Sequence, residues 1–435
     1  MFEIALSFTW YIILLFIVWR WSAFQLPGFS PFVVVILFTI KVLAGVLLTF
    51  FYTYMYNDRF NSDLFKLYDD SKHIYDALPV KPIDFIKMTL GIDADNPYYD
   101  RYYYRMYNWF PYYENTVHHD TRTMIRLNAF FRLFSFGAFQ VHNIFMCFLS
   151  TLGLVAVYQT FYAYFTDRKL GLLIAVFLFP SAILWGSGML KEGLMLLALG
   201  LFLKGIWPII HHQVTFKNLA LTGIGILIFA TVKIYVLLAL LPGLALVYLG
   251  LRLRIQKWGT LFLSGAFIAL VFLCISPTLM GDYSPLTYLS NRQQDMLRLI
   301  YYTNPGSAID MQPLQPKWFS LLRLLPEAYF NALFRPTLVE SKGLLQLFSA
   351  LENAGLMIFI FTWFGLIQMP TRNKYVFWFL LSVAFILLAL MGLTTPILGT
   401  LNRYRVPAMP FLLMAIFISI DFKRLKAVIQ QIFRL

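Results

Sequence analysis

Long apolar runs recur along the whole chain, and they restrict its fold more than any other feature of the sequence. Runs of about 18 or more residues with few charges are long enough to cross a lipid bilayer as helices. The strands of a β-barrel would instead give short segments of alternating hydropathy. Of the 435 residues 60% are hydrophobic, which is above the usual content of a soluble domain. The sequence therefore predicts an all-α, polytopic helical membrane protein, with residues 1–435 forming a single integral membrane domain.

The apolar runs predict about eleven transmembrane helices. The run at 127–164 is long for one span, so it either tilts strongly or includes an interfacial helix. Two long loops remain, at about residues 57–126 and 280–345. The predicted spans are 4–19, 30–55, 127–164, 170–189, 193–210, 218–232, 234–250, 259–279, 346–368, 375–391 and 406–420.

Basic residues gather in the short loops and predict the orientation of the chain. If the spans alternate, these loops share one side of the membrane, which the positive-inside rule makes cytoplasmic. The N-terminus and both long loops then face out, and the C-terminus faces in. The net charge of +14 follows largely from this topology, so we expect no nucleic acid partner. The basic segments are "RW" at 20–21, "DRK" at 167–169, "KNL" at 217–219, "RLRIQK" at 252–257, "TRNK" at 371–374 and the C-terminal tail.

Acidic residues concentrate in the first long loop, which holds eleven of the 21 in the chain. Most are expected to be solvated. Asp63, Asp69 and Asp70 differ, because they follow the second span closely. They lie in "DLFKLYDDSKHIYDAL", whose apolar residues fit one face of a helix near the membrane. We therefore treat Asp63 and Asp70 as candidate catalytic carboxylates.

Charged side chains also stand at the outer ends of the later spans. A charge at the centre of a membrane helix costs about 2.5–3.5 kcal/mol, and cations are disfavoured on the outer side. Any one of these charged side chains, taken alone, is explained by snorkelling to the lipid headgroups or by ion pairing. Together they predict an outer cavity for a lipid-linked phosphate, because Arg and Lys bind phosphate oxygens. The candidate binding residues are Lys191, Glu192, Lys233, Tyr235, Arg335, Glu352, Arg403 and Arg405.

Two segments carry a resemblance to a known family. "LNRYRVPAMPFLL" at 401–413 and "FPSAILWGSGMLKEGL" at 179–194 resemble the terminal segment and the middle hairpin of polytopic C-type glycosyltransferases (the GT-C fold). Members of that family use polyprenyl-phosphate-linked sugars and transfer them with inversion. In that family an acid in the first outer loop acts as base or orients the acceptor, and basic residues bind the lipid phosphate. In this chain the loop follows the second span instead of the first. This departure leaves open which acid corresponds to that of the family, and the candidates are Asp63 first and Asp70 second.

The resemblance implies a membrane glycosyltransferase of a bacterial inner membrane, with its active face on the periplasmic side. Its partners would be a polyprenyl-linked sugar donor, a cell-envelope glycan or lipid acceptor, and the surrounding membrane lipids. Two alternatives stay open. One is a polymerase of polysaccharide repeat units, and the other is a lipid or solute transporter or flippase. Transporters usually place polar residues near the bilayer midplane and often contain inverted repeats.

The remaining signals for cofactors are weak. Histidine pairs at 118–119 and 211–212 have no third good ligand nearby in the sequence, so no metal site is predicted, although a divalent cation stays open. Cys147 and Cys274 lie in apolar runs and are expected to pack as free, small hydrophobic side chains. The chain contains no nucleotide-binding loop or nucleophile elbow, which agrees with a lipid-borne donor.

Overall fold

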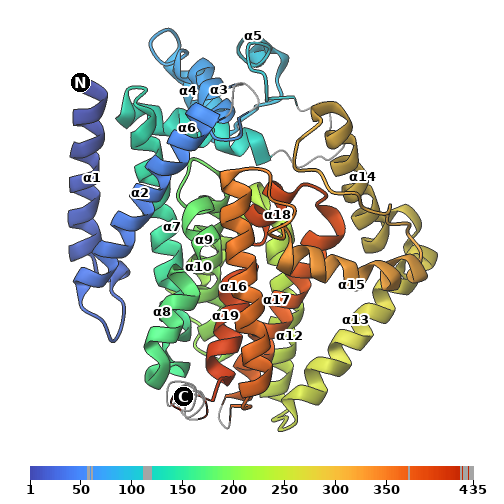
Figure 1. The fold of residues 1–435 in the computed structure, drawn as a ribbon. Helices are drawn as coiled ribbons and strands as arrows, with labels where there is room; N and C mark the ends of the chain where they lie inside the picture. Colours follow the sequence, from blue (N-terminus) through green and yellow to red (C-terminus); the bar gives the residue numbers. More distant parts are fainter. Residues whose placement is uncertain are drawn as a thin grey trace. The chain divides into compact units, whose positions relative to one another are not determined.

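The protein is helical throughout the part of the chain that the structure describes. This computed structural model describes residues 1–55, 59, 62–110, 120–370, 373–421, 424 and 430. Within these ranges it contains nineteen α-helices, two isolated β-bridges and no β-strand (Figure 1). Eight of the helices are long and apolar enough to cross a membrane, so the chain is an all-α polytopic membrane protein, as predicted. They are α1 (Phe2–Arg20), α2 (Pro31–Met55), α7 (Phe139–Phe161), α10 (Lys191–Ile210), α12 (Ile234–Arg252), α13 (Trp258–Met280), α16 (Leu344–Leu366) and α17 (Lys374–Thr394).

The other predicted spans divide into two groups. Two shorter apolar helices, α11 (Phe216–Val232) and α19 (Ala408–Ser419), correspond to the runs at 218–232 and 406–420. The run at 170–189 is not one helix, which corrects the prediction. It forms α8 (Lys169–Phe177) and α9 (Pro180–Trp185), because Pro180 lacks the N–H that would continue α8.

The long run at 127–164 is also broken. It contains the end of α6 (Asp120–Ser135) followed by α7. The break falls at Phe136 and Gly137, which have φ values of +48° and +88°. Glycine adopts such a left-handed conformation without steric penalty. The run therefore contains a separate helix before the span, which is one of the two predicted alternatives.

Both long loops contain helices of their own. The first holds α3 (Lys66–Tyr75), α4 (Pro82–Leu90) and α5 (Asp100–Tyr103), and the second holds α14 (Pro285–Thr303) and α15 (Trp318–Phe334). Residues 111–119 and most of the basic C-terminal tail lie outside the described ranges. The last short helix is α18 (Leu398–Tyr404), and the 3₁₀ turns are η1 (Ser22–Phe24), η2 (Pro97–Tyr99), η3 (Tyr162–Tyr164), η4 (Thr166–Arg168) and η5 (Gly281–Tyr283).

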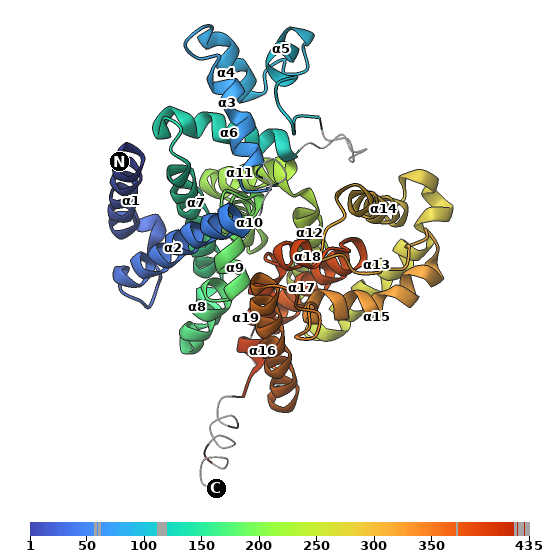
Figure 2. The same ribbon diagram turned by 45° about the horizontal axis from the view of Figure 1, so that its top comes forward.

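The chain divides into two compact units. The first comprises Met1–Thr160 and Ile183–Leu237, and the second comprises Phe161–Ala182 and Leu238–Leu435. Within the first unit, α3, α4 and α6 lie together at one end of α7 (Figures 1 and 2). Within the second unit, α13 contacts both α14 and α15, and α17 packs against both α15 and α19.

The predicted amphipathic helix of the first loop is confirmed as α3. It buries Leu67, Tyr68 and Ile74 on the face that the sequence pattern indicates. Arg132 of α6 fixes it in place, since its guanidinium donates to the Ser71 hydroxyl and to the Tyr68 carbonyl, both at 2.8 Å. The first loop is thus attached to the helix that leads into α7.

Glycines allow α7 and α10 to cross at very short distance. A Cβ atom added at Gly200 would lie 2.0 Å from the carbonyl oxygen of Gly153, and one added at Gly153 would lie 2.1 Å from that of Leu196. Small residues permit such close backbone approach between membrane helices, where van der Waals packing drives association. The core of the first unit therefore depends on these two positions remaining glycine.

Gly200→Ala should lower the free energy of unfolding by about 1–3 kcal/mol, the usual penalty for overpacking a dense interior. Gly223 of α11 is the matched control, because no atom lies within 4 Å of a Cβ placed there. Gly223→Ala should be neutral or slightly stabilising, because alanine has the higher helix propensity. Thermal unfolding of the purified protein in detergent measures both, and equal midpoints for the two variants would contradict the close crossing.

The second unit has an apolar core around α15 and α17. A Cβ at Gly392 of α17 would lie 1.9 Å from the Ala328 carbonyl oxygen of α15, so the two backbones touch. At one end of this unit Tyr375 donates a hydrogen bond to Tyr164 at 3.1 Å, and its ring lies 5.2 Å from that of Trp258. The basic segments next to these residues therefore share one end of the unit, as alternating spans predict. The core cluster consists of Leu286, Leu314, Leu321, Leu324, Ala328 and Leu393.

Candidate functional site

Two of the predicted cations meet at one carboxylate in the first unit. Lys191 Nζ donates to Asp120 Oδ1 at 2.6 Å, and Lys233 Nζ lies 3.9 Å from Asp120 Oδ2. The Lys233 ammonium also lies 5.7 Å from the centre of the Tyr235 ring. All three charged side chains are largely buried. Asp120 is thus shared between two ammonium groups.

Local structure explains why these residues converge. Lys191 begins α10, and Lys233 is the single residue between α11 and α12. Thr123 of α6 donates to the Thr231 carbonyl at 3.0 Å, which ties the start of α6 to the end of α11. Glu192 lies buried in the first turn of α10, where a carboxylate is stabilised by the helix dipole. The cluster therefore forms where the starts of α6, α10 and α12 and the end of α11 come together.

The segment that carries Asp63 packs next to this cluster. Asp63 forms an ion pair with Lys66 at 2.5 Å, and its side chain remains 38% exposed. The neighbouring Leu64 is fully buried, with its Cδ1 atom 3.1 Å from the Cβ position of Gly188. Gly188 belongs to the turn that precedes Lys191. Leu64, the residue after Asp63, therefore contacts the turn that leads to Lys191.

Asp70 has a different environment. It is 2% exposed and accepts hydrogen bonds from the backbone N–H groups of Tyr107, at 3.1 Å, and Asn108, at 2.8 Å. The Asn108 side-chain amide donates a third bond at 3.0 Å. Burial raises the pKa of the Asp70 carboxyl, while these hydrogen bonds act in the opposite direction. Asp70 thus anchors the end of the first loop, and Asp63 is the candidate acid that a substrate hydroxyl could reach.

The second unit contains a buried ion pair of its own. Arg405 is completely buried, and its Nη2 donates to Glu352 Oε1 at 2.6 Å. Glu352 Oε2 accepts the backbone N–H of Ser181 at 2.5 Å, and Arg405 Nη1 reaches the Leu333 carbonyl at 3.5 Å. The pair therefore joins α16, the end of α18 and the start of α9. This geometry gives both residues a structural role, and their binding of phosphate stays a prediction.

The two remaining arginines also differ from each other. Arg335 Nε donates to Glu340 at 2.7 Å, and Glu340 also accepts the Thr337 N–H at 2.8 Å. Burial acts to raise the pKa of Glu340, but the hydrogen bonds from Arg335 and Thr337 outweigh it and hold that pKa below its usual value. Arg403 is half-buried at the end of α18. That Arg403 and Arg405 share a cavity with the lysines of the first unit stays a prediction.

Two residues of interest were not singled out from the sequence. Asp120 pairs with Lys191 and Lys233, while nearby Arg122 pairs with Asp95 at 2.9 Å. Lys41 lies inside α2, is 3% exposed, and its ammonium has no hydrogen-bond partner in the described part of the chain. An ionisable residue within a long apolar run is the sequence signal that marks such a position.

Metal ligands and thiols give no further site. Among the residues that the structure describes, no group of three His, Cys, Asp or Glu side chains could hold a metal ion. The histidine pair at 118–119 lies outside those residues, and His211 Nδ1 lies 2.8 Å from the Trp207 carbonyl oxygen. Cys147 and Cys274 are free thiols, as expected.

Comparisons with known proteins identify no relative of this chain. Searches against protein-family models, curated proteins and solved structures find no match to this chain. What its own helices establish is that it is an all-α protein with multiple membrane-spanning helices.

Proposed function

We propose that this chain is a membrane glycosyltransferase. It moves a sugar from a polyprenyl-(di)phosphate donor to a cell-envelope glycan or lipid acceptor, at the outer face of a bacterial inner membrane. The observation that carries the proposal is the meeting of Lys191 and Lys233 on Asp120, where membrane-spanning helices begin. The second requirement is a carboxylate that an acceptor can reach, and partly exposed Asp63 is the candidate, because the next residue, Leu64, contacts the turn before Lys191.

The chemistry assigns a role to each group. The two ammonium groups neutralise the phosphate oxygens of the donor as the leaving group departs. Asp120 holds both lysines in place before the donor binds. Asp63 takes the proton of the acceptor hydroxyl, whose oxygen attacks the anomeric carbon. The attack comes from the face opposite the phosphate, so the configuration inverts, and the bond from that carbon to the phosphate oxygen breaks with its electron pair on the phosphate. Arg403 is a further candidate for the phosphate.

Lys191→Gln and Lys233→Gln should each slow sugar transfer about 10- to 100-fold, because a hydrogen bond to a charged group contributes about 1.5–3 kcal/mol. Asp63→Asn, made in the wild-type background, should remove most of the sugar transfer. Lys217→Gln is the matched control, since Lys217 is an exposed lysine of the same unit. The measurement is transfer of radiolabelled glucose, mannose or galactose from polyprenyl-phosphate donors in membranes, at equal protein level. Unchanged transfer in the cluster variants and in Asp63→Asn would refute this site.

The size of the product separates the first alternative from this proposal. A repeat-unit polymerase would use similar cations and a similar outer carboxylate. It would yield a ladder of long glycans, whereas a transferase adds one sugar to each acceptor. Gel analysis of the labelled product in the same assay distinguishes the two.

A transporter or flippase is favoured by one observation, the buried lysine of α2. Lys41 is the eleventh of 25 residues in that helix, so it lies close to the middle of the span. Intramembrane ionisable residues commonly mark transport pathways. Flux through proteoliposomes that is abolished by Lys41→Met, with no covalent turnover of the lipid-linked sugar, would support transport in place of transfer.

A further inference from the structure

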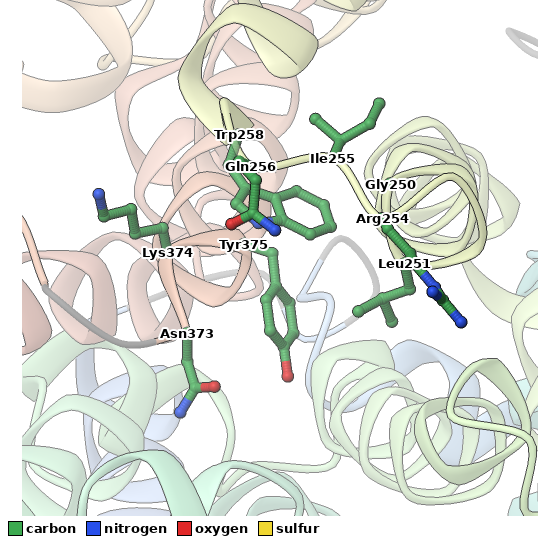
Figure 3. Close-up of a pocket in the computed structure, with 9 residues that line it drawn as sticks. All are labelled: Gly250, Leu251, Arg254, Ile255, Gln256, Trp258, Asn373, Lys374 and Tyr375. Carbon is green, nitrogen blue, oxygen red and sulfur yellow. The ribbon is translucent and has the colours of Figure 1, made fainter.

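A pocket of about 340 Å³ lies at the end of the second unit where the rings of Tyr375 and Trp258 pack together. It is formed by the turn that joins α12 to α13 and by the residues that begin α17 (Figure 3). The polar residues that line it are Arg254, Gln256, Asn373 and Lys374, and the rings of Trp258 and Tyr375 complete the wall.

The charge around this pocket is positive and uncompensated. Arg254 and Lys374 line it on opposite sides of the Tyr375 ring, with their charged ends directed away from that ring, and no Asp or Glu is among the lining residues (Figure 3). Arg252 and Lys257 flank it in the sequence. None of these four cations forms an ion pair in the described ranges. Like charges gathered without acidic neighbours create a positive potential that attracts anions.

Backbone donors point to the same ligand chemistry. α13 and α17 both begin at the pocket, with Trp258 and Lys374 as their first residues. Neither helix has a side-chain cap on its first N–H groups. Uncapped N–H groups at a helix start carry partial positive charge and bind anions. Two helix starts, two cationic side chains and two side-chain amides therefore surround one space.

The pocket lies at the ends of membrane-spanning helices, which places it at the membrane boundary. It lies at the ends of α12, α13 and α17, each long and apolar enough to cross a bilayer. Trp and Tyr side chains, such as Trp258 and Tyr375 here, prefer the level of the lipid headgroups. The opposite end of α17 leads into α18 and Arg403, so the pocket and that arginine lie at opposite ends of one span.

We propose that this pocket is a binding site for a phosphate group at the membrane boundary. Arg254 and Lys374 pair with the phosphate oxygens, while Gln256, Asn373 and the first N–H groups of α13 and α17 donate hydrogen bonds. The headgroup of an anionic phospholipid and free phosphate present the same oxygens, and the experiment separates these two sources. The proposal does not depend on sugar transfer.

The test uses the full chain purified in detergent. Native mass spectrometry compares retention of phosphatidylglycerol with retention of phosphatidylcholine, and thermal unfolding is titrated with inorganic phosphate. The double variant Arg254→Gln/Lys374→Gln should weaken binding about tenfold or more, since charge-assisted hydrogen bonds are lost. Gln256→Glu should also weaken binding of the anion while it keeps every cation. It places a negative charge in the pocket on a side chain of nearly the same shape as glutamine. Gel filtration verifies that each variant is folded.

A second double variant controls for net charge. Arg323→Gln/Lys342→Gln removes two exposed cations of the same unit that lie outside the pocket, and it should bind like the wild type. Preferential retention of phosphatidylglycerol that the pocket variants lose supports a lipid headgroup. Saturable stabilisation by inorganic phosphate that the same variants lose supports free phosphate. Equal binding in all variants, or no preference of the wild type for either anionic probe, overturns the proposal.

Discussion

Glu352→Ala should lower the free energy of unfolding by about 3–5 kcal/mol, the usual effect of removing one partner of a buried ion pair. The reason is that Arg405 is completely buried and its Nη2 donates to Glu352 at 2.6 Å. Alanine would leave that guanidinium without its counter-charge and the Ser181 N–H without its acceptor. Equilibrium unfolding in detergent, followed by intrinsic fluorescence or circular dichroism, measures the change.

A second ion pair in the same unit provides the control. Glu340 pairs with Arg335, but both side chains keep contact with solvent. Glu340→Ala should therefore lower the unfolding free energy by only about 1 kcal/mol or less. The double variant Glu352→Leu/Arg405→Met should recover much of the lost stability, because apolar replacement of both partners is often tolerated. If Glu352→Ala and Glu340→Ala had equal effects, the buried pair would not be a structural link.

Asp70→Ala should lower the unfolding free energy by about 1–3 kcal/mol, because the three donors that this buried carboxylate satisfies would lose their acceptor. Those donors are the backbone N–H groups of Tyr107 and Asn108 and the Asn108 amide. Amide hydrogen exchange at residues 107 and 108 should accelerate at the same time. Both changes are measured on the purified protein.

The neighbouring acid on the same helix tests whether burial is the cause. Asp69 pairs with Arg59 at 2.7 Å, and both side chains are exposed to solvent. Asp69→Ala should change stability by about 1 kcal/mol or less. Protection of residues 107 and 108 should stay as in the wild type. Accelerated exchange there in Asp69→Ala as well would mean that the carboxylate of Asp70 is not the anchor.

The positions of the helices could be predicted largely from hydropathy. Membrane helices satisfy their backbone hydrogen bonds internally, so a long apolar run is enough to locate one. The same local signals gave α3 in the first loop, from its apolar face. They failed at 170–189, where the apolar content is continuous but Pro180 starts a new helix. Hydropathy does not register that interruption, since proline is not strongly polar.

The candidate site could be predicted only as a set of residue types. Unneutralised charges at span ends drew attention to Lys191 and Lys233, but their shared partner Asp120 is 71 positions from Lys191 in the chain. Arg403 and Arg405 look equivalent in "NRYR". Residues two apart on a helix point to different sides, and here one is completely buried on Glu352 while the other is half-buried.

By itself, the sequence determined that this protein is helical and that it crosses a membrane several times. It also identified the charged side chains whose place at or inside an apolar span costs free energy. These properties are local, because they depend on the polarity of consecutive residues and on the backbone hydrogen bonds within one helix. Only the tertiary structure decided which charge neutralises which, and which carboxylate remains open to solvent. Those outcomes depend on distances between segments far apart in the chain, and packing sets such distances.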